Sequence, residues 1–395
     1  MDCFGRRSRR GWSGCSNGKK QLFWKFHLIS IYGLGRRDYS REPKLRAATL
    51  TMRGGLLQIS NLRLVRLILS GLTTLCICSL GGAIRGPVLG FIFDRQVRGI
   101  RPILGIPGAS TQAGPLRLGA SLSDAAISNA QDYALGVVEK SNELIQFSGL
   151  GGSVSRRLLA PGPQAIDLLR LSPSATAAAL YHAGTRTVQI ISGFPRRPVV
   201  GKELDISTLP DSPSTIAVSD DARFVGAVVN SRHSAETFLI DTDANTRQVF
   251  KGAHISAVAF MGATHDLLVA DEVNDSIHVL HAVDSSAAAV VIAGREDGVL
   301  GPVAAGASPD GRHVFVVNTR PASVIVLDLR NHTAPKYACH CAPTDLMPLK
   351  GRATFLFSHP VDGPLWVFDG DAAQPRVVFV PSPGLAKIST QGAAQ

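Results

Sequence analysis

A motif of a tight turn, a strand, a hairpin turn and a second strand recurs about every 44 residues from Ile127 onward. In its clearest copy, residues 308–312 (Ser-Pro-Asp-Gly-Arg) form the turn, and residues 313–318 and 323–328 form two apolar strands. Further copies span residues 131–147, 173–191, 220–241, 263–280 and 350–369. A repeat of this length that contains only strands and turns predicts a β-propeller, because one four-stranded blade takes ~40–50 residues.

The spacing of the repeats predicts the number of blades. Aligned positions are separated by 43, 47, 43, 46 and 40 residues, and they are Tyr133, Thr176, Arg223, Asp266, Arg312 and Arg352. Before these six repeats, residues 90–94 read as a third strand and residues 99–104 as a fourth. After them, residues 374–381 complete the last repeat, and residues 385–389 could add one more strand. We therefore predict an all-β ring of seven blades, each of four antiparallel strands, closed by the N- and C-terminal strands. Six blades with an extra N-terminal hairpin is the alternative.

The clearest repeat divides into four strands, at residues 303–307, 313–318, 323–329 and 336–342. The second is almost wholly apolar, as expected of a strand that neighbouring blades cover on both faces. The third strand ends at an Asp in several copies, namely at Asp241, Asp328 and Asp369. The fourth is short and irregular, which suits the edge of a sheet.

The strands at residues 315–318 (Phe-Val-Val-Asn) and 323–328 resemble the YVTN repeat of bacterial propellers, a superfamily that includes lactonase-like and amine-dehydrogenase-like members. The resemblance covers roughly residues 90–383 and is clearest in this copy. It implies a seven-bladed ring in an exported bacterial protein. It implies no particular activity, because members of such folds differ in function.

The formal charge of +11 is concentrated at the N-terminal end of the chain. Residues 1–51 carry +9 and residues 52–85 carry +4, whereas residues 86–395 hold 25 basic and 27 acidic groups, a charge of −2. A surface that follows a phosphate backbone would need a basic excess in the repeats themselves. We therefore expect no nucleic-acid partner.

Two segments precede the repeats. Residues 1–51 form a basic leader, which is either disordered or upstream of the true start at Met52. After Met52, a basic stretch precedes an uncharged apolar run at residues 67–84 that ends in small residues, which is the pattern of a secretory signal. An uncleaved membrane anchor is the alternative, because 18 residues reach the lower edge of the ~17–25 that span a bilayer.

We accordingly expect a signal peptide or anchor at residues 52–83, a propeller at residues 84–384 and a tail at residues 385–395. The protein would then be periplasmic or extracellular. It would contact a membrane only if residues 67–84 are retained, and it would then be anchored by a single pass.

Only two cysteines, Cys339 and Cys341, lie within the repeats. Residues two apart on a strand project to the same face, but such close residues rarely meet disulfide geometry. His340 would point to the opposite face, so that one metal ion could not easily take all three side chains. We therefore expect two small buried side chains in an outer strand.

Titratable side chains that could build a catalytic centre are scattered over the blades. The histidines are His233, His254, His265, His278, His281, His313, His332 and His359, and the acids are Asp220, Asp221, Asp271, Glu272, Asp275 and Asp310. Most of these acids fall in turns, where Asp side chains bond their own backbone. No Gly-x-Ser-x-Gly elbow, His-Glu-x-x-His helix or P-loop occurs. We assign no catalytic or cofactor-binding residue.

The densest acidic loop, residues 271–275, supplies the candidate metal ligands Asp271, Glu272 and Asp275. Carboxylate oxygens are the ligands that hard cations prefer, although the spacing fits no EF-hand loop. Two Asn-x-Ser/Thr sequences, at Asn274 and Asn331, match the glycosylation pattern but carry little weight in a bacterial protein.

These features favour an exported, non-enzymatic and monomeric propeller that uses no cofactor and binds a protein, peptide or glycan on its blade loops. A lactonase-type hydrolase or the propeller part of a periplasmic oxidoreductase is one alternative, and a membrane-tethered sensor domain is another. An enzyme should place a cluster of His, Asp and Glu, or a metal, at one mouth of the channel. A scaffold should line the channel with small and apolar residues.

Overall fold

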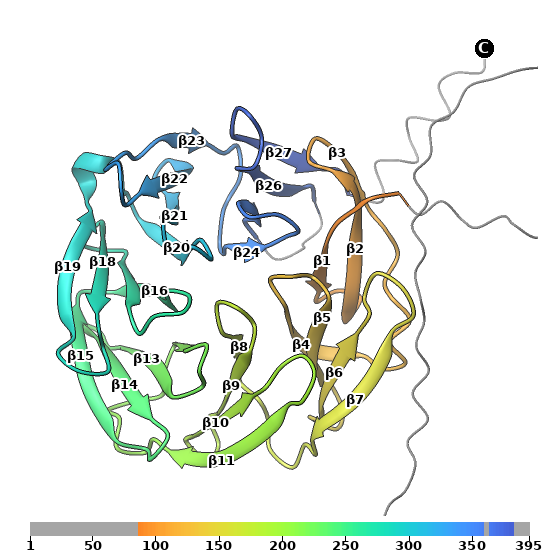
Figure 1. Ribbon diagram of the computed structural model, residues 1–395, viewed down its shortest axis with the longest axis horizontal. Coiled ribbons are helices and arrows are strands. Elements are labelled where there is room, and N and C mark those ends of the chain that lie inside the picture. Colours follow the sequence, from red (N-terminus) through yellow and green to blue (C-terminus); the bar gives the residue numbers. More distant parts are fainter. Residues whose placement is uncertain (1–85, 359–362, 383–395) are drawn as a thin grey trace, which may run out of the picture. The chain divides into compact units, whose positions relative to one another are not determined.

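The computed structural model describes residues 86–358 and 363–382, which form a ring of seven blades (Figure 1). Six blades are four-stranded antiparallel sheets, and the blade formed by the first strands has three described strands. The prediction of seven rather than six blades is confirmed. The part of the chain that the structure describes contains one short helix, η1 (Arg295–Asp297), and no helix long and apolar enough to cross a membrane.

The blades are numbered in chain order, and each contains consecutive strands. Blade 1 contains β1 (Val88–Asp94), β2 (Gly99–Ile106) and β3 (Ala109–Gln112), and blade 2 contains β4 (Leu122–Ile127), β5 (Tyr133–Val138), β6 (Leu144–Ser148) and β7 (Ser155–Ala160). Blade 3 contains β8 (Leu168–Leu171), β9 (Ala177–His182), β10 (Thr187–Ser192) and β11 (Val199–Asp205), and blade 4 contains β12 (Thr215–Val218), β13 (Phe224–Asn230), β14 (Ala235–Asp241) and β15 (Thr246–Gly252). Blade 5 contains β16 (Ile255–Phe260), β17 (Leu267–Asp271), β18 (Ser276–His281) and β19 (Ala288–Ala293). Blade 6 contains β20 (Pro302–Ala307), β21 (His313–Thr319), β22 (Ala322–Asp328) and β23 (Lys336–Ala338), and blade 7 contains β24 (Met347–Pro348), β25 (Thr354–Leu356), β26 (Leu365–Asp369) and β27 (Arg376–Val380).

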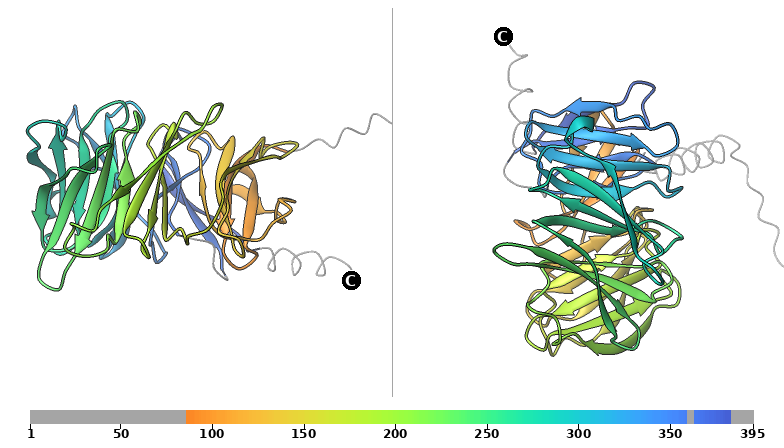
Figure 2. Two further views of the ribbon diagram at one scale, coloured as in Figure 1. Left: turned by 90° about the horizontal axis from the view of Figure 1, so that it is seen from below. Right: turned by 90° about the vertical axis from the view of Figure 1, so that its left-hand side faces the viewer.

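The hydrophobic core is divided among the interfaces between blades, which stand face to face around the ring (Figure 2). Each pair of neighbouring blades shares one buried hydrophobic cluster, including the pair formed by blade 7 and blade 1. Between blades 6 and 7, for example, Phe315, Phe357 and Phe368 are at most 2% exposed. The second strands β9 and β17 are buried along their whole length, which explains their apolar sequences.

A serine at the end of the innermost strand explains the turn signature of the repeat. Ser128, Ser172, Ser219 and Ser308 are buried, and each Oγ accepts the backbone N–H five residues later, at 3.3, 3.1, 3.0 and 2.9 Å. Three of these hydroxyl groups also donate to an Asp in the same turn: Ser128 to Asp132, Ser219 to Asp221 and Ser308 to Asp310. The side of the ring that carries these turns is called the turn face below. The opposite side, where the chain enters each innermost strand, is called the mouth face.

Blade 1 differs from the expected arrangement. Residues 90–94 and 99–104 were expected to be third and fourth strands, but β1 and β2 occupy the second and third positions and β3 the outermost. The turn from Asp94 to Gly99 has the pairing of the turns that join second to third strands elsewhere, as from Asp271 to Ser276. Asp94 at the end of β1 suggested a third strand, but second strands such as β17 also end in Asp. No innermost strand of blade 1 lies within the described residues, and the strand expected at residues 385–389 falls outside them.

Side chains and turns of the neighbouring blades contact the inner edge of β1 and close the ring. The buried amide of Gln131 accepts the N–H of Phe91 at 2.6 Å and donates to the carbonyl of Pro348 at 2.8 Å. The N–H of Lys350 donates to the carbonyl of Leu89 at 2.8 Å. The first and last blades therefore meet through direct bonds.

Cys339 and Cys341 form a disulfide, which corrects the expectation of two reduced side chains in a strand. β23 ends at Ala338, and the chain bends at His340, which brings the two Cα atoms to 5.2 Å. This separation lies within the usual disulfide range, whereas residues two apart on an extended strand are farther from each other.

Candidate functional site

A pocket lies on the axis of the ring. It has a volume of about 370 Å³ and is lined by the innermost strands of blades 2–7 and by β1. At its middle level the innermost strands contribute Ala126, Arg170, Ala217, Ala259, Gly306 and Met347. At this level the lining is small or apolar except at Arg170. The volume is within the ~300–1,000 Å³ typical of small-molecule sites.

Four charged side chains also line the pocket. Asp124 and Asp345 lie on or just before innermost strands toward the mouth face, and Arg95 follows β1 on the same side. Arg170 lies deeper, at the middle level of the pocket. None of the histidines singled out above is among the lining residues.

The turns of four consecutive blades meet across the axis at the turn face. Asp220 of blade 4 accepts the N–H of Ser174 in blade 3 at 2.7 Å and the N–H of Ala263 in blade 5 at 3.2 Å. A Cβ atom added at Gly262 would lie 3.5 Å from the carbonyl oxygen of Pro309 in blade 6. These contacts narrow the turn-face end of the pocket.

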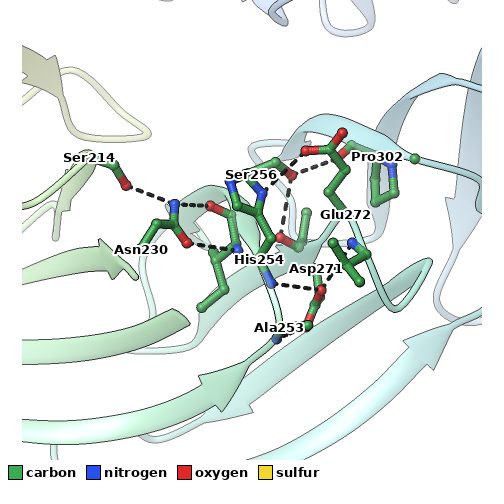
Figure 3. A network of polar contacts seen from close by, with 12 residues as sticks. Ser214, Asn230, Ala253, His254, Ser256, Asp271, Glu272 and Pro302 are labelled. Atoms are coloured by element: carbon green, nitrogen blue, oxygen red, sulfur yellow. Dashed lines mark hydrogen bonds and ion pairs between the residues drawn. The ribbon is translucent and has the colours of Figure 1, made fainter. Parts of the chain in front are cut away.

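A polar network lies on the mouth face, where blades 4, 5 and 6 meet (Figure 3). Asp271 is fully buried and accepts the backbone N–H groups of Ala253, His254, Val273 and Asn274 and the side-chain amide of Asn274, at 2.8–3.3 Å. These five donors satisfy the carboxylate completely. Asp271 therefore holds the connection into β16 and has no lone pair directed at solvent.

Asn230 makes a similar link from the end of β13. Its amide exchanges two hydrogen bonds with the backbone of Ile255, at 2.9 and 3.1 Å, and also donates to Ser214 Oγ at 3.0 Å (Figure 3). The amide thus ties blade 4 to the start of β16 in blade 5. Because its partners are mainly backbone groups, its role is architectural.

His254, Ser256 and Glu272 lie close together on this face without forming a catalytic triad. His254 Nδ1 is 3.2 Å from a carboxylate oxygen of Glu272, and both side chains are exposed. Ser256 Oγ, however, donates to the carbonyl of Pro302 at 2.5 Å and reaches that of Ala270 at 3.4 Å (Figure 3). The hydroxyl proton is directed at backbone carbonyls, whereas a nucleophile would direct it at the imidazole.

Asp275, the third candidate metal ligand, is also buried and paired. It accepts the N–H of Gly301 at 2.6 Å and forms ion pairs with Arg295 and, at 3.1 Å, Arg320. The hydrogen bond from Gly301 and the two guanidinium groups lower the pKa of Asp275 below its ordinary value. The two arginines extend from this carboxylate toward solvent.

The acidic loop therefore holds its backbone and two arginines, and Asp271 and Asp275 have no free oxygen to offer. Within the described ranges, no three His, Cys, Asp or Glu side chains are arranged to hold a metal ion. The metal site at Asp271, Glu272 and Asp275 stays a prediction that the geometry does not favour.

The remaining candidate histidines take separate positions around the ring. His265 of blade 5 lies between Asp221 of blade 4 and Asp284 of its own blade, at 2.9 and 2.8 Å. His281 contacts Asp266 at 2.9 Å, and His313 lies 3.7 Å from Asp328. His278 is partly buried beside Ser276, and burial lowers its pKa. His233 and His332 lie in turns, and His359 lies outside the described residues.

Arg170 and Gln131 were not predicted as functional or closing residues. A comparison of the repeats could have indicated Arg170, because the equivalent positions of the other repeats hold Ala, Gly or Met. Gln131 gives no such signal, since its partners Phe91 and Pro348 are distant in sequence and meet only when the ring closes.

Solved structures with a similar fold include proteins of different descriptions. A functionally unknown protein from Desulfotomaculum acetoxidans is 14% identical, with 75% of this chain and 100% of that chain covered and a TM-score of 0.52. A protein from Lactobacillus plantarum is 12% identical, with 75% and 96% covered and a TM-score of 0.50. A putative 6-phosphogluconolactonase from Bacteroides fragilis is 14% identical, with 75% and 95% covered and a TM-score of 0.49.

At these identities the likeness shows the fold alone. No family model matches the sequence, and no curated protein matches it. The resemblance to YVTN-repeat propellers therefore stays a prediction.

Proposed function

We propose that this protein is an exported, non-catalytic propeller that binds a small, largely apolar ligand in its axial pocket. The observation that carries the proposal is the pocket of about 370 Å³, with small apolar side chains from successive blades at its middle level. Burying an apolar ligand there removes its surface and that of the lining from water, which is the main source of affinity for such a site.

The polar groups of the mouth face support this choice over binding or catalysis by the loops. Asp271, Asn230 and Ser256 form hydrogen bonds with backbone groups at or next to neighbouring strands. Groups committed in this way hold the mouth in shape and offer little to a ligand. We therefore propose that the ligand binds in the channel and not, as expected from the sequence, on the blade loops.

Export is supported by two features of the chain. The disulfide between Cys339 and Cys341 suits an oxidising compartment, and the segment at residues 52–83 has the composition of a secretory signal. The resemblance of the Phe315–Asp328 strands to YVTN repeats points the same way. If the protein is exported, it should be recovered in the periplasmic fraction, and thiol labelling there without reductant should leave Cys339 and Cys341 unmodified. Recovery in the cytoplasmic fraction alone would contradict export.

The ligand site can be tested with an uncharged apolar fluorophore, N-phenyl-1-naphthylamine. Ala259→Phe adds a ring in the pocket and should weaken binding at least tenfold, because the probe and the ring compete for one volume. Ala289→Phe is the matched control, since Ala289 is exposed on the outer strand β19. Equal binding by wild type and Ala259→Phe, or no binding by wild type, would overturn the proposal.

A further inference from the structure

We infer that the ligand of the axial pocket carries a carboxylate group and that Arg170 binds it. This inference rests on the proposed function and names the chemical class of the ligand. It is argued from the position of Arg170, from the hydrogen-bonding capacity of its guanidinium and from the other charges of the pocket.

Among the described residues, Arg170 is the single charged side chain at its level of the pocket. It lies two residues before the turn serine of blade 3, on β8, and the equivalent positions of the other innermost strands hold Ala126, Ala217, Ala259, Gly306 and Met347. An arginine facing an apolar ring of this kind loses part of its hydration when a ligand fills the pocket. It is therefore the place where an anionic group would gain most.

The guanidinium of Arg170 is largely uncommitted within the protein. Its Nη1 donates to the carbonyl of Leu169 at 3.0 Å, and it forms no ion pair with any residue in ranges 86–358 and 363–382. The side chain of Arg170 is exposed to solvent and lines the pocket. A guanidinium has five N–H donors in a planar fork, so enough remain to hold a carboxylate with two parallel hydrogen bonds.

The other pocket charges define how such a ligand would lie. Asp124 and Asp345 occupy positions two residues closer to the mouth face, about 6–7 Å along the strand direction, and Arg95 lies on the same side. Asp124 accepts the N–H of Ala125 at 2.9 Å, and Asp345 accepts that of Leu346 at 2.7 Å. A ligand would therefore bind with its carboxylate at Arg170 and its apolar body among the alanines. Its negative charge would then lie deeper in the pocket than Asp124 and Asp345.

Three ligands with the same ten-carbon chain separate charge from apolar burial. Decanoate, decanol and decylamine are each used to displace N-phenyl-1-naphthylamine from the full chain at neutral pH, where the acid and the amine are ionised. We expect decanoate to displace the probe at a concentration about tenfold lower than decanol, because a charge-assisted bidentate bond adds to the same burial. Decylamine should be the weakest competitor.

Arg170→Met keeps the length of the side chain and removes its charge. This variant should lose the preference for decanoate over decanol while still binding the neutral probe. Arg157→Met is the matched control, because Arg157 also donates one hydrogen bond to a backbone carbonyl, that of Arg196, but lies on the outer strand β7. It should keep the wild-type preference.

The outcomes distinguish this inference from the proposed function. Failure of every probe to bind wild type would overturn both. Binding of the neutral probe with equal competition by decanoate and decanol, or an unchanged preference in Arg170→Met, would overturn only the role of Arg170. Stronger competition by decylamine would overturn the carboxylate assignment and point to Asp124 and Asp345 as the charges that select the ligand.

Discussion

Single side chains hold the junction between the first and last blades. Gln131 is 4% exposed and bridges Phe91 of blade 1 and Pro348 of blade 7 from its own place in blade 2. One amide thus connects three blades at the point where the ring closes.

Replacing Gln131 by Ala should lower the free energy of unfolding by roughly 2–3 kcal/mol, because the N–H of Phe91 and the carbonyl of Pro348 lose a buried partner. Urea denaturation followed by tryptophan fluorescence would measure the change. Gln189→Ala is the control, since the Gln189 amide donates to Gly201 within blade 3 at an exposed position, and its cost should stay below about 1 kcal/mol. Equal losses in the two variants would contradict the closing role.

His265 makes the link between blades 4 and 5 depend on pH. Burial alone would lower the pKa of His265, but its hydrogen bonds with Asp284 and Asp221 outweigh burial and raise the pKa above the ordinary value of 6.5. Because the folded pKa exceeds the unfolded one, the stabilisation is fully present below about pH 6.5 and is lost as pH rises through the folded pKa.

The stability difference between wild type and His265→Gln should therefore shrink between pH 6 and pH 9. Denaturation curves of the two proteins at several pH values would show this, since Gln does not titrate. A constant or growing difference over that range would show that the imidazole is neutral in the folded protein.

Arg170 also illustrates what one repeat conceals when it is considered alone, because only comparison with the other repeats distinguishes it. Its neighbours on β8 resemble those of any innermost strand, and nothing local marks it as the charge that faces the pocket. Among the scattered acids, the roles differ: Asp220 and Asp275 accept hydrogen bonds from outside their own turns. Asp221 and Asp310 do bond the backbone of their own turns.

At the scale of the strand and turn, a buried serine organises four of the blades. Blades 5 and 7 have Met261 and Leu349 at the equivalent position, where the backbone bonds remain but no hydroxyl accepts the later N–H. The serine therefore adds to a turn that the backbone already forms.

Ser219→Ala should cost about 1–2 kcal/mol, because the N–H of Phe224 and the carboxylate of Asp221 each lose a buried partner. Thermal unfolding would report the loss as a lower midpoint. Ser207→Ala, in an exposed turn after β11, should leave the midpoint unchanged. If Ser219→Ala behaves like this control, the serine does not stabilise the turn.

The strands were predictable because apolar runs and turn residues alternate with a fixed period. In blade 6 the first three expected strands agree with β20, β21 and β22 to within one residue at each end. The expected fourth strand begins where β23 begins, but β23 ends earlier, at Ala338. The disulfide was missed because a strand was assumed to continue through Cys339 and Cys341. The bend at His340 depends on packing that periodicity does not record.

At the scale of the whole molecule, the repeats predicted a ring in which the first and last blades meet, but not the contacts that join them. Sequence periodicity reports which residues are buried between blades, and seven interfaces follow from it. The closure depends on contacts such as Lys350 with Leu89, which are far apart along the chain. A contact of this kind occurs once in the molecule and so does not appear in the repeat pattern of the sequence.

The compact unit of the structure begins at Gly82, which predicts that residues 82–395 fold without the N-terminal segment. The fragment and the full chain should show the same unfolding midpoint within about 2 °C by differential scanning calorimetry, since the blade interfaces described above lie within residues 86–382. A large loss of enthalpy in the fragment would show that the N-terminal segment is part of the folded unit.

The convergence of turns around Asp220 at the turn face affects how fast a ligand can be exchanged. With that end narrowed, capture and escape share the opposite mouth as their main route. A macromolecule that merely caps this mouth, without touching the bound ligand, would slow both steps by the same factor. Residence time would lengthen while the equilibrium occupancy stayed constant.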